Sequence, residues 1–348
     1  MAERKFEAAL KIKPDQHEAL YNWGKALAAR AKRASDAAEA ERLFQAAEEK
    51  YEAALKIKPD KHEALYNWGN ALAERAKRAS DAAEAERLFQ AAEQKYEAAL
   101  KIKPDQHVAL NNWGGALAEQ ARRASDAAEA ERLFQAAVKK FEAALKIKPD
   151  QHEALYNWGN ALGDRANRAS DAAEAERLFQ AAEEKNEAAL KIKPDQHEAL
   201  HNWGATLAER ANRASDAAEA ERLFQAAAEK YEAALKIKPD KHEALNNWGA
   251  TLADRANRAS DAAEAERLLA LAEEKLRAGV KLAPGNVYNL ACLMALRNRS
   301  DECREFLEIA EKANTLPLAD SLITDEDLAS VRGESWFTAL VERRRQKP

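Results

Sequence analysis

The sequence predicts an all-α solenoid of stacked antiparallel helix hairpins, and three observations support this prediction. A segment of residues 11–24, KIKPDQHEALYNWG, recurs with few changes every 45 residues. Charged residues make up 33% of the chain and aromatic residues only 7%, and alanine, leucine, glutamate and lysine dominate, as in long packed helices. Proline and glycine return at fixed positions in each copy. A period of this length is typical of a repeat array and not of unrelated domains.

Each repeat is predicted to contain two helices, which we call helix A and helix B. In the first repeat, apolar residues recur at three- and four-residue steps over about residues 17–34 and again over about 37–57. Neither helix can bury its apolar stripe alone, so the hairpins must stack on their neighbours. No segment shows the alternating pattern of a strand.

Polar residues at the helix starts are predicted to act as caps. Pro14 ends the preceding helix, and Asp15 with Glu18 has the spacing of a capping box for helix A. Asp36 with Glu39 has the same spacing for helix B. These signals repeat in every copy, so the boundaries of all hairpins follow from the first.

A glycine in the middle of helix A indicates close packing. Gly24 costs about 1 kcal/mol relative to alanine at an interior helix position. The same glycine recurs at Gly69, Gly114, Gly159, Gly204 and Gly249. We therefore expect another helix to approach the backbone at each glycine, with the neighbouring Trp23 filling the adjoining space.

The pattern L-Y-N-W-G-x-A-L in helix A, followed by A-x-x-K-Y-E-A-A-L-K-I-K-P-D in helix B, resembles the tetratricopeptide repeat. The matching positions in the first repeat are Leu20, Trp23, Gly24, Ala47, Tyr51, Ala54 and Pro59. The resemblance covers residues 15–317 and implies a right-handed superhelix whose concave face is lined by helices A. In that family the concave face binds peptides.

The repeat departs from the family in its length. The family unit has 34 residues, whereas this unit has 45, and the segment RASDAAEAERL is absent from the last, shorter unit. The insertion therefore falls at the elbow between helices A and B and lengthens both. The predicted organisation is a partial helix at 1–14, six long hairpins at 15–284, an ordinary hairpin at 285–317 and a helical cap at 318–348.

Composition excludes several classes of protein. A net charge of −5 disfavours a nucleic-acid binder, which needs a basic surface. The two cysteines, Cys292 and Cys303, indicate no disulfide framework. No run of apolar residues is long enough for a membrane span, and no signal-peptide core is present. The chain is expected to be cytoplasmic and to bind neither nucleic acid nor membrane.

No candidate site for catalysis, metal or cofactor emerges. His17 returns in the same register of every repeat, but equivalent residues of stacked helices lie about 8–10 Å apart. Two ligands of one zinc ion must both lie about 2 Å from it, so this row of histidines cannot share ions. No glycine-rich phosphate loop or nucleophile–base arrangement is present. We therefore expect a non-enzymatic protein without cofactors.

The copies differ mainly along one stripe of helix A, which is the predicted partner-binding surface. The positions equivalent to Tyr21 and Lys25 vary most, and the first-turn position is Glu18 or its equivalent in all repeats but one, which has Val108. The predicted binding residues are Glu18, Tyr21, Lys25, Glu63, Tyr66, Asn70, Asn111, Tyr156, Asn160, His201 and Asn246. Because the first-turn glutamates repel an acidic tail, the expected partner is a neutral or mildly basic protein segment.

Three other interpretations remain open at this stage. The half-helix around Phe6, Ala9 and Leu10 would allow copies of the chain to stack into homo-oligomers. A helical-repeat RNA reader would need a basic groove, which the charge balance disfavours. Near-identity of the copies also fits recent duplication or design, with no partner at all. Separately, Asn186 replaces an apolar residue of helix B, which predicts a locally weak hairpin.

Overall fold

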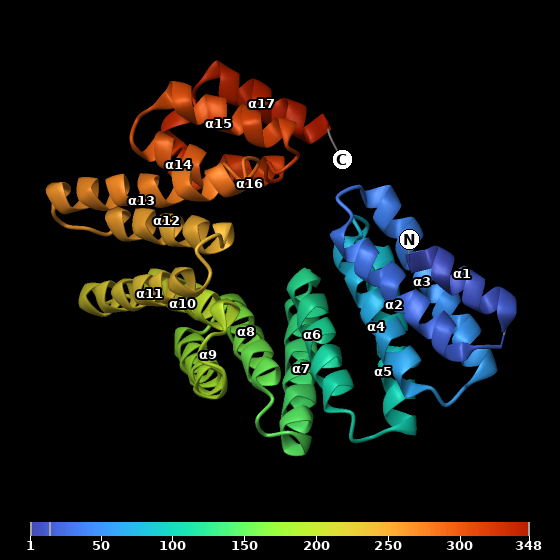
Figure 1. The fold of residues 1–348 in the computed structure, drawn as a ribbon. Helices are drawn as coiled ribbons and strands as arrows, with labels where there is room; N and C mark the ends of the chain where they lie inside the picture. The colour runs from blue at the N-terminus through green and yellow to red at the C-terminus, as the bar shows by residue number, and fades with distance from the viewer. Residues whose placement is uncertain (1, 14, 347–348) are drawn as a thin grey trace. The chain divides into compact units, whose positions relative to one another are not determined.

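The computed structural model describes residues 2–13 and 15–346, without the side chains of 2–5 and 7. All regular secondary structure in these ranges is helical, and the helices form antiparallel pairs stacked in repeats. The predicted all-α fold class is confirmed. The chain divides into two compact units, Met1–Ile192 and Lys193–Pro348, which are described separately below. Figure 1 shows the first unit from α1 to α9 and the second from α10 to α17.

The first unit contains one short helix and four hairpins. The short helix is α1 (Ala2–Ile12), and Pro14, predicted to end it, lies outside the described residues. The A helices have 17 residues each and the B helices 21. The hairpins are α2 (His17–Arg33) with α3 (Ala37–Ile57), α4 (His62–Arg78) with α5 (Ala82–Ile102), α6 (His107–Arg123) with α7 (Ala127–Ile147), and α8 (His152–Arg168) with α9 (Ala172–Ile192).

The second unit continues the repeat and then changes. Its long hairpins are α10 (His197–Arg213) with α11 (Ala217–Ile237) and α12 (His242–Asn257) with α13 (Ala262–Leu282). The next hairpin, α14 (Tyr288–Leu296) with α15 (Ser300–Lys312), has helices of only 9 and 13 residues. The chain then forms α16 (Ala319–Thr324), the 3₁₀ helix η1 (Glu326–Val331) and α17 (Ser335–Gln346). Phe337 of α17 is buried in the core, as expected for a cap.

The caps differ between the two helices of a hairpin. The Asp36 side chain accepts a hydrogen bond from the Glu39 backbone N–H at 2.6 Å, which confirms the predicted cap of helix B. The predicted capping box of Asp15 and Glu18 is wrong. Helix α2 begins at His17, and its N-cap residue Gln16 makes no side-chain cap hydrogen bond. The Glu18 carboxylate instead accepts a hydrogen bond from Lys61 Nζ of the next repeat at 2.6 Å.

The repeated glycine is the point of closest approach between helices A and B. A Cβ atom added to Gly114 would lie 2.7 Å from Cε1 of Phe141, and one added to Gly24 would lie 2.8 Å from Cε1 of Tyr51. The tryptophan packs on the preceding repeat. The ring of Trp113 in α6 stacks on the ring of Tyr96 in α5, with the ring centroids 6.2 Å apart. The glycine thus fixes the third hairpin internally, as expected from the sequence, and the tryptophan fixes it to the second hairpin.

A lysine of helix B covers the tryptophan of every long repeat. In the third hairpin, Lys140 Nζ lies 3.3 Å from the centroid of the Trp113 ring. Equivalent pairs join Lys50 to Trp23, Lys95 to Trp68, Lys185 to Trp158, Lys230 to Trp203 and Lys275 to Trp248. This cation–π contact shields the edge of the hydrophobic core while the charge stays near solvent.

The arginine that begins the elbow segment bonds to the preceding repeat. Arg78 donates hydrogen bonds to the carbonyl oxygens of Ala34 at 3.0 Å and Lys32 at 2.6 Å, at the end of the preceding A helix. Arg123 and Arg258 bridge to the preceding repeat in the same way. These arginines satisfy carbonyl groups that a helix end leaves without partners. The elbow is therefore a structural connector between hairpins.

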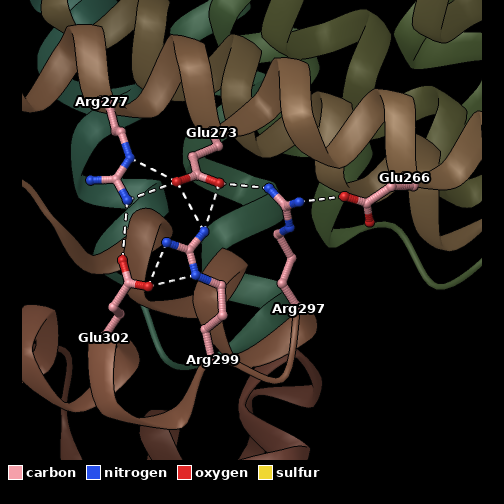
Figure 2. Close-up of polar contacts among 6 residues, drawn as sticks. All are labelled: Glu266, Glu273, Arg277, Arg297, Arg299 and Glu302. Carbon is pink, nitrogen blue, oxygen red and sulfur yellow. Dashed lines mark hydrogen bonds and ion pairs between the residues drawn. The ribbon is translucent and has the colours of Figure 1, made fainter.

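An ion network joins the last long helix to the shorter hairpin that follows it (Figure 2). Glu273 of α13, with 15% of its side chain exposed, lies at the centre of the network. It accepts hydrogen bonds from Arg277 Nε at 2.8 Å, Arg297 Nη1 at 2.6 Å and Arg299 Nη1 at 2.9 Å. Glu302 then links Arg277 to Arg299. The shortened repeat thus replaces the missing elbow contacts with charges.

Candidate functional site

The candidate site is the exposed side of the A helices, which we call the A face. Neighbouring A helices contact one another within each unit: α2 with α4, α4 with α6, α6 with α8, and α10 with α12. Successive B helices make no comparable contact in the described part of the chain. The A helices therefore form the more closely spaced row of each stack, and side chains on the A face can act together on one ligand.

Hydrogen bonds between consecutive A helices cross the A face at regular intervals. Asn67 Nδ2 donates to the Tyr21 hydroxyl at 3.1 Å, and Asn157 Nδ2 donates to Asn111 Oδ1 at 3.0 Å. In the second unit, Asn247 Nδ2 lies 3.0 Å from His201 Nε2. The donor is the asparagine that precedes the repeated tryptophan. This asparagine is not among the binding residues predicted from the sequence, although its identity in all six copies was a usable signal.

Tyr21 is held from several sides. Lys61 Nζ lies 4.7 Å from the centre of its ring and also pairs with Glu18 at 2.6 Å. Burial raises the pKa of Tyr21 to about 12, so its hydroxyl is protonated at neutral pH. The bond to Lys61 is the main cause that lowers the pKa of Glu18. Tyr21 therefore offers a rigid aromatic surface and not a titratable group.

The predicted binding residues are exposed to different degrees. Glu18 and Lys25 are exposed, and most of the others are partly exposed, as suits an accessible face. Asn70 Oδ1 accepts a hydrogen bond from the Tyr96 hydroxyl at 2.7 Å, so this oxygen is already used within the repeat. Asn111 is the exception, because only 5% of it is exposed and it is bonded to Asn112 and Asn157. We therefore leave Asn111 out of the contact surface proposed below.

The third repeat makes the A face of the first unit locally apolar, at a patch formed by Val108 and Gly115. Val108 replaces the first-turn glutamate and is 37% exposed. Gly115 replaces Lys25, and no atom beyond the adjoining backbone of its own helix lies within 4 Å of the position that its Cβ would occupy. On the helices before and after, the equivalents of Val108 are Glu63 and Glu153, whose side chains are 41% and 55% exposed. The patch is thus apolar and exposed, with a carboxylate on the helix before it and on the helix after it.

From the second long repeat on, the A helices carry a carboxylate near the elbow, and its partners differ between the two units. In the first unit Glu74 pairs with Lys77 at 3.0 Å and with Lys32 at 3.6 Å. In the second unit Asp254 accepts instead from the neutral Asn212 at 2.8 Å. Burial raises the pKa of Asp254 above its ordinary value. At this end of the A face, Asp254 is thus bonded to a neutral amide, whereas Glu74 is paired with two lysines.

One family profile, described as the plant-specific mitochondrial import receptor subunit TOM20, matches this chain three times. The matches cover residues 1–110, 104–198 and 177–298, which together are most of the chain. The chain belongs to this family. The TOM20 family is tetratricopeptide-like, so the resemblance drawn from the repeat motifs is confirmed. No curated protein sequence matches the chain.

Solved structures similar to this TOM20-family chain are tetratricopeptide-repeat proteins and an import adaptor. YrrB, described as having an unusual peptide-binding site, is 17% identical, with a TM-score of 0.39 over 69% of this chain and 95% of its own. TTC0263 from Thermus thermophilus is 15% identical, with a TM-score of 0.47 over 66% of this chain and 98% of its own. Nro1, described as a nuclear import adaptor, is 14% identical, with a TM-score of 0.48 over 80% of this chain and 93% of its own.

The row of histidines is used within the TOM20-family repeat. His107 Nδ1 lies 2.9 Å from Gln151 Oε1 of the next repeat. His152 Nε2 lies 3.2 Å from Glu153, and His197 Nε2 lies 3.1 Å from Glu198. These contacts give the histidines structural partners at the first turn of helix A, as the sequence analysis favoured.

The cysteines are free and buried, as expected. Burial raises the pKa of the Cys303 thiol to about 12 and that of Cys292 still further, so neither is a reactive thiolate. Cys292 lies in a polar cluster with Asp325 and Asp327, whose ligand atoms are within 4.8 Å of one another. Asp325 already accepts from the Tyr288 hydroxyl at 2.5 Å. Its other carboxylate oxygen accepts from the Asp327 backbone N–H at 3.0 Å, so Asp325 is a cap of η1.

The polar cluster predicts an inverted pH dependence for the second unit. Burial, then the charges of Asp325 and Asp254, raise the pKa of Asp327 from 3.8 to about 6, against a hydrogen bond from Asn257 that lowers it. The folded state thus holds this proton more tightly than the unfolded state. The Asp327 contribution to the unfolding free energy should therefore fall as pH rises from about 4 to 6, by about 3 kcal/mol in total.

This expectation is checked by urea denaturation at several pH values between about 4 and 7. Asp327→Asn should raise stability at pH 7 and weaken the pH dependence in this window. Asp320→Asn, which changes a largely exposed aspartate near the same cap, is the matched control and should leave the pH dependence unchanged. If Asp327→Asn has the same pH dependence of stability as the wild type, ionisation of Asp327 does not destabilise the folded state and the expectation is wrong.

Phe6 of the N-terminal helix, predicted to be open for stacking between copies of the chain, packs within the chain itself. The Phe6 ring stacks on Trp23 of α2, with centroids 6.2 Å apart and planes inclined by 14°. Phe6 therefore occupies the position that Tyr96 takes against Trp113, inside the chain's own packing. Phe6→Glu would disturb the fold and is not a clean test of stacking between copies.

Among the described residues, no helix is both long enough and apolar enough to cross a membrane.

Proposed function

We propose that this TOM20-family chain is a non-enzymatic scaffold that binds an extended segment of another protein along the A face. The observation that carries the proposal is the clustering of the differences between repeats on this face, while the elbow segment is identical in all six long repeats. The family is named for an import receptor subunit, and YrrB is described as having a peptide-binding site, which supports this kind of partner. Family members of this type are typically non-catalytic.

The A face of the first unit specifies the chemistry of the partner. Tyr21, Tyr66 and Tyr156 offer aromatic surface at low conformational cost. Glu63 and Glu153 flank the apolar patch at Val108 and Gly115. A segment with an apolar centre and basic residues on both sides would complement this arrangement, while an acidic tail would be repelled.

Binding of defined peptides tests the proposal. The probe is a peptide with central leucines flanked by arginines, and its counterpart has glutamates in place of the arginines. We expect the basic peptide to bind more tightly, and we expect the variant with Tyr21→Ala, Tyr66→Ala and Tyr156→Ala to bind it about tenfold more weakly or worse. Titration calorimetry, after circular dichroism has shown that the variant is folded, measures both.

A matched control substitutes the same number of exposed residues on the B helices. Gln45, Gln90 and Gln135 bond only to glutamates one turn earlier in their own helices. Replacing all three with alanine should leave binding unchanged. If the tyrosine variant and the glutamine variant lose the same affinity for the basic peptide, the A face is not the binding site. If the basic and the acidic peptide bind equally well, the glutamates of the A face do not select the charge of the partner.

Two further parts of the proposal concern setting and assembly. The cytoplasmic location predicted from the sequence stays a prediction, since the family name refers to a mitochondrial receptor. Self-assembly is the second candidate function, and concentration-dependent mass in analytical ultracentrifugation distinguishes it from binding of a separate partner.

A further inference from the structure

Hairpin four, formed by α8 and α9, contains a buried polar residue without partners. Asn186 of α9 is 0% exposed, and neither its Nδ2 nor its Oδ1 has a hydrogen-bond partner among the described residues. A buried amide left unpaired loses its hydration without compensation. The equivalent residues in the other long hairpins are aromatic or aliphatic: Tyr51, Tyr96, Phe141, Tyr231 and Leu276.

The amide occupies the place of the missing ring. A Cβ added to Gly159 would lie 2.8 Å from Asn186 Oδ1, just as one added to Gly69 would lie 3.0 Å from Cε1 of Tyr96. In the second hairpin the Tyr96 hydroxyl also bonds to Asn70 at 2.7 Å. Asparagine is too short to replace either the ring or its hydroxyl, so hairpin four loses apolar burial and one hydrogen bond between its helices.

The A helix of the same hairpin is weakened independently. Gly163 stands where the other A helices have Ala28, Ala73, Ala118, Ala208 and Ala253. Glycine in a helix interior is less favourable than alanine, because it gives up more backbone entropy on folding. Helix α8 therefore contains two buried interior glycines, Gly159 and Gly163.

Both departures lie at the end of the first compact unit. This unit ends at Ile192, which is also the last residue of α9. In a solenoid, stability is approximately a sum of hairpin terms and nearest-neighbour terms. A weak hairpin therefore allows the hairpins on its two sides to unfold separately.

We propose that hairpin four is a built-in weak point that opens locally before the other hairpins, so that the two units unfold in separate steps. The sequence had suggested local weakness at Asn186. The structure adds the unpaired amide, the second glycine and the coincidence with the unit boundary.

Hydrogen exchange on the full chain, followed by mass spectrometry of peptic fragments, tests this proposal. Fragments that span Asn186 differ in mass from their counterparts around Tyr51 and Tyr96, so they can be assigned despite the repeats. We expect amides of α9 to exchange about tenfold faster or more than the equivalent amides of α5. Equal protection in α9 and α5 would overturn the proposal.

Variants that exchange these residues between hairpins test whether fast exchange in α9 is caused by Asn186 and Gly163 or by the place of hairpin four in the chain. Asn186→Tyr and, separately, Gly163→Ala should each slow exchange in hairpin four, and together they should merge the two urea transitions into one. Tyr96→Asn should transfer fast exchange to α5 while leaving α9 unchanged. If α9 still exchanges fast in the double variant, its opening follows from its place in the chain, and the proposal is wrong.

Discussion

Gly114→Leu is expected to destabilise the first unit by about 3 kcal/mol or more. The Cβ alone would lie 2.7 Å from Cε1 and 2.9 Å from Cδ1 and Cζ of the Phe141 ring. That ring is fully buried and packed between helices, so it cannot move aside without displacing α7 from α6. Leucine is a good helix former, so any loss of stability reports packing and not helix propensity. Urea denaturation measures the effect.

The adjacent residue provides the control. Gly115 lies in the same helix, and no atom beyond the adjoining backbone of its own helix lies within 4 Å of the position that its Cβ would occupy. Gly115→Ala should therefore raise stability by about 0.5–1 kcal/mol through helix propensity alone. If both substitutions shift the denaturation midpoint in the same direction, the close approach of the helices is not what selects glycine at position 114.

Glu273→Gln is expected to cost about 2 kcal/mol and to loosen the junction between α13 and the shorter hairpin. Three arginines surround this carboxylate (Figure 2), and the amide that replaces it cannot balance their charges. Removing one partner of a largely buried ion pair leaves the others uncompensated, although the partial exposure of the arginines reduces the penalty. Thermal denaturation of the second unit should show the loss.

Glu274→Gln is the matched control for Glu273. Glu274 is the next residue, its side chain is 67% exposed and it pairs only with Lys275 at 2.8 Å. Exposed pairs of this kind contribute about 0–1 kcal/mol, so the substitution should change stability little. High salt should narrow the difference between wild type and Glu274→Gln but preserve most of the effect at Glu273. Equal losses of stability in Glu273→Gln and Glu274→Gln would show that the ion network around Glu273 does not stabilise the junction more than an exposed ion pair does.

The hairpins were predictable because their signals are local and repeated. Helix boundaries near His17 and Ile57, the cap at Asp36 and the close approach at Gly24 all follow from patterns within one repeat. Six copies of each signal remove the ambiguity that a single copy would leave. The shortened last hairpin was likewise visible as a missing elbow.

The remaining features depend on contacts between repeats, which a local pattern does not contain. Glu18 has the spacing of a capping box, but Lys61 of the next repeat provides a charged partner for its carboxylate. Asn111 lies on the variable stripe but is buried by its bond to Asn157 of the next repeat. Phe6 is at the start of the chain and still stacks on Trp23. In each of these three cases the deciding contact is made with a residue of another helix, which a pattern within one helix does not reveal.

Photo-crosslinking tests the central claim most directly, since it locates a bound peptide on the chain. The probe is the arginine-flanked leucine peptide with a photoreactive residue at its apolar centre. We predict crosslinks to residues around Val108 and Gly115, and their loss in Val108→Glu, which restores the repeat consensus. Crosslinks confined to the B helices or the elbows, or unchanged in Val108→Glu, would contradict binding along the A face.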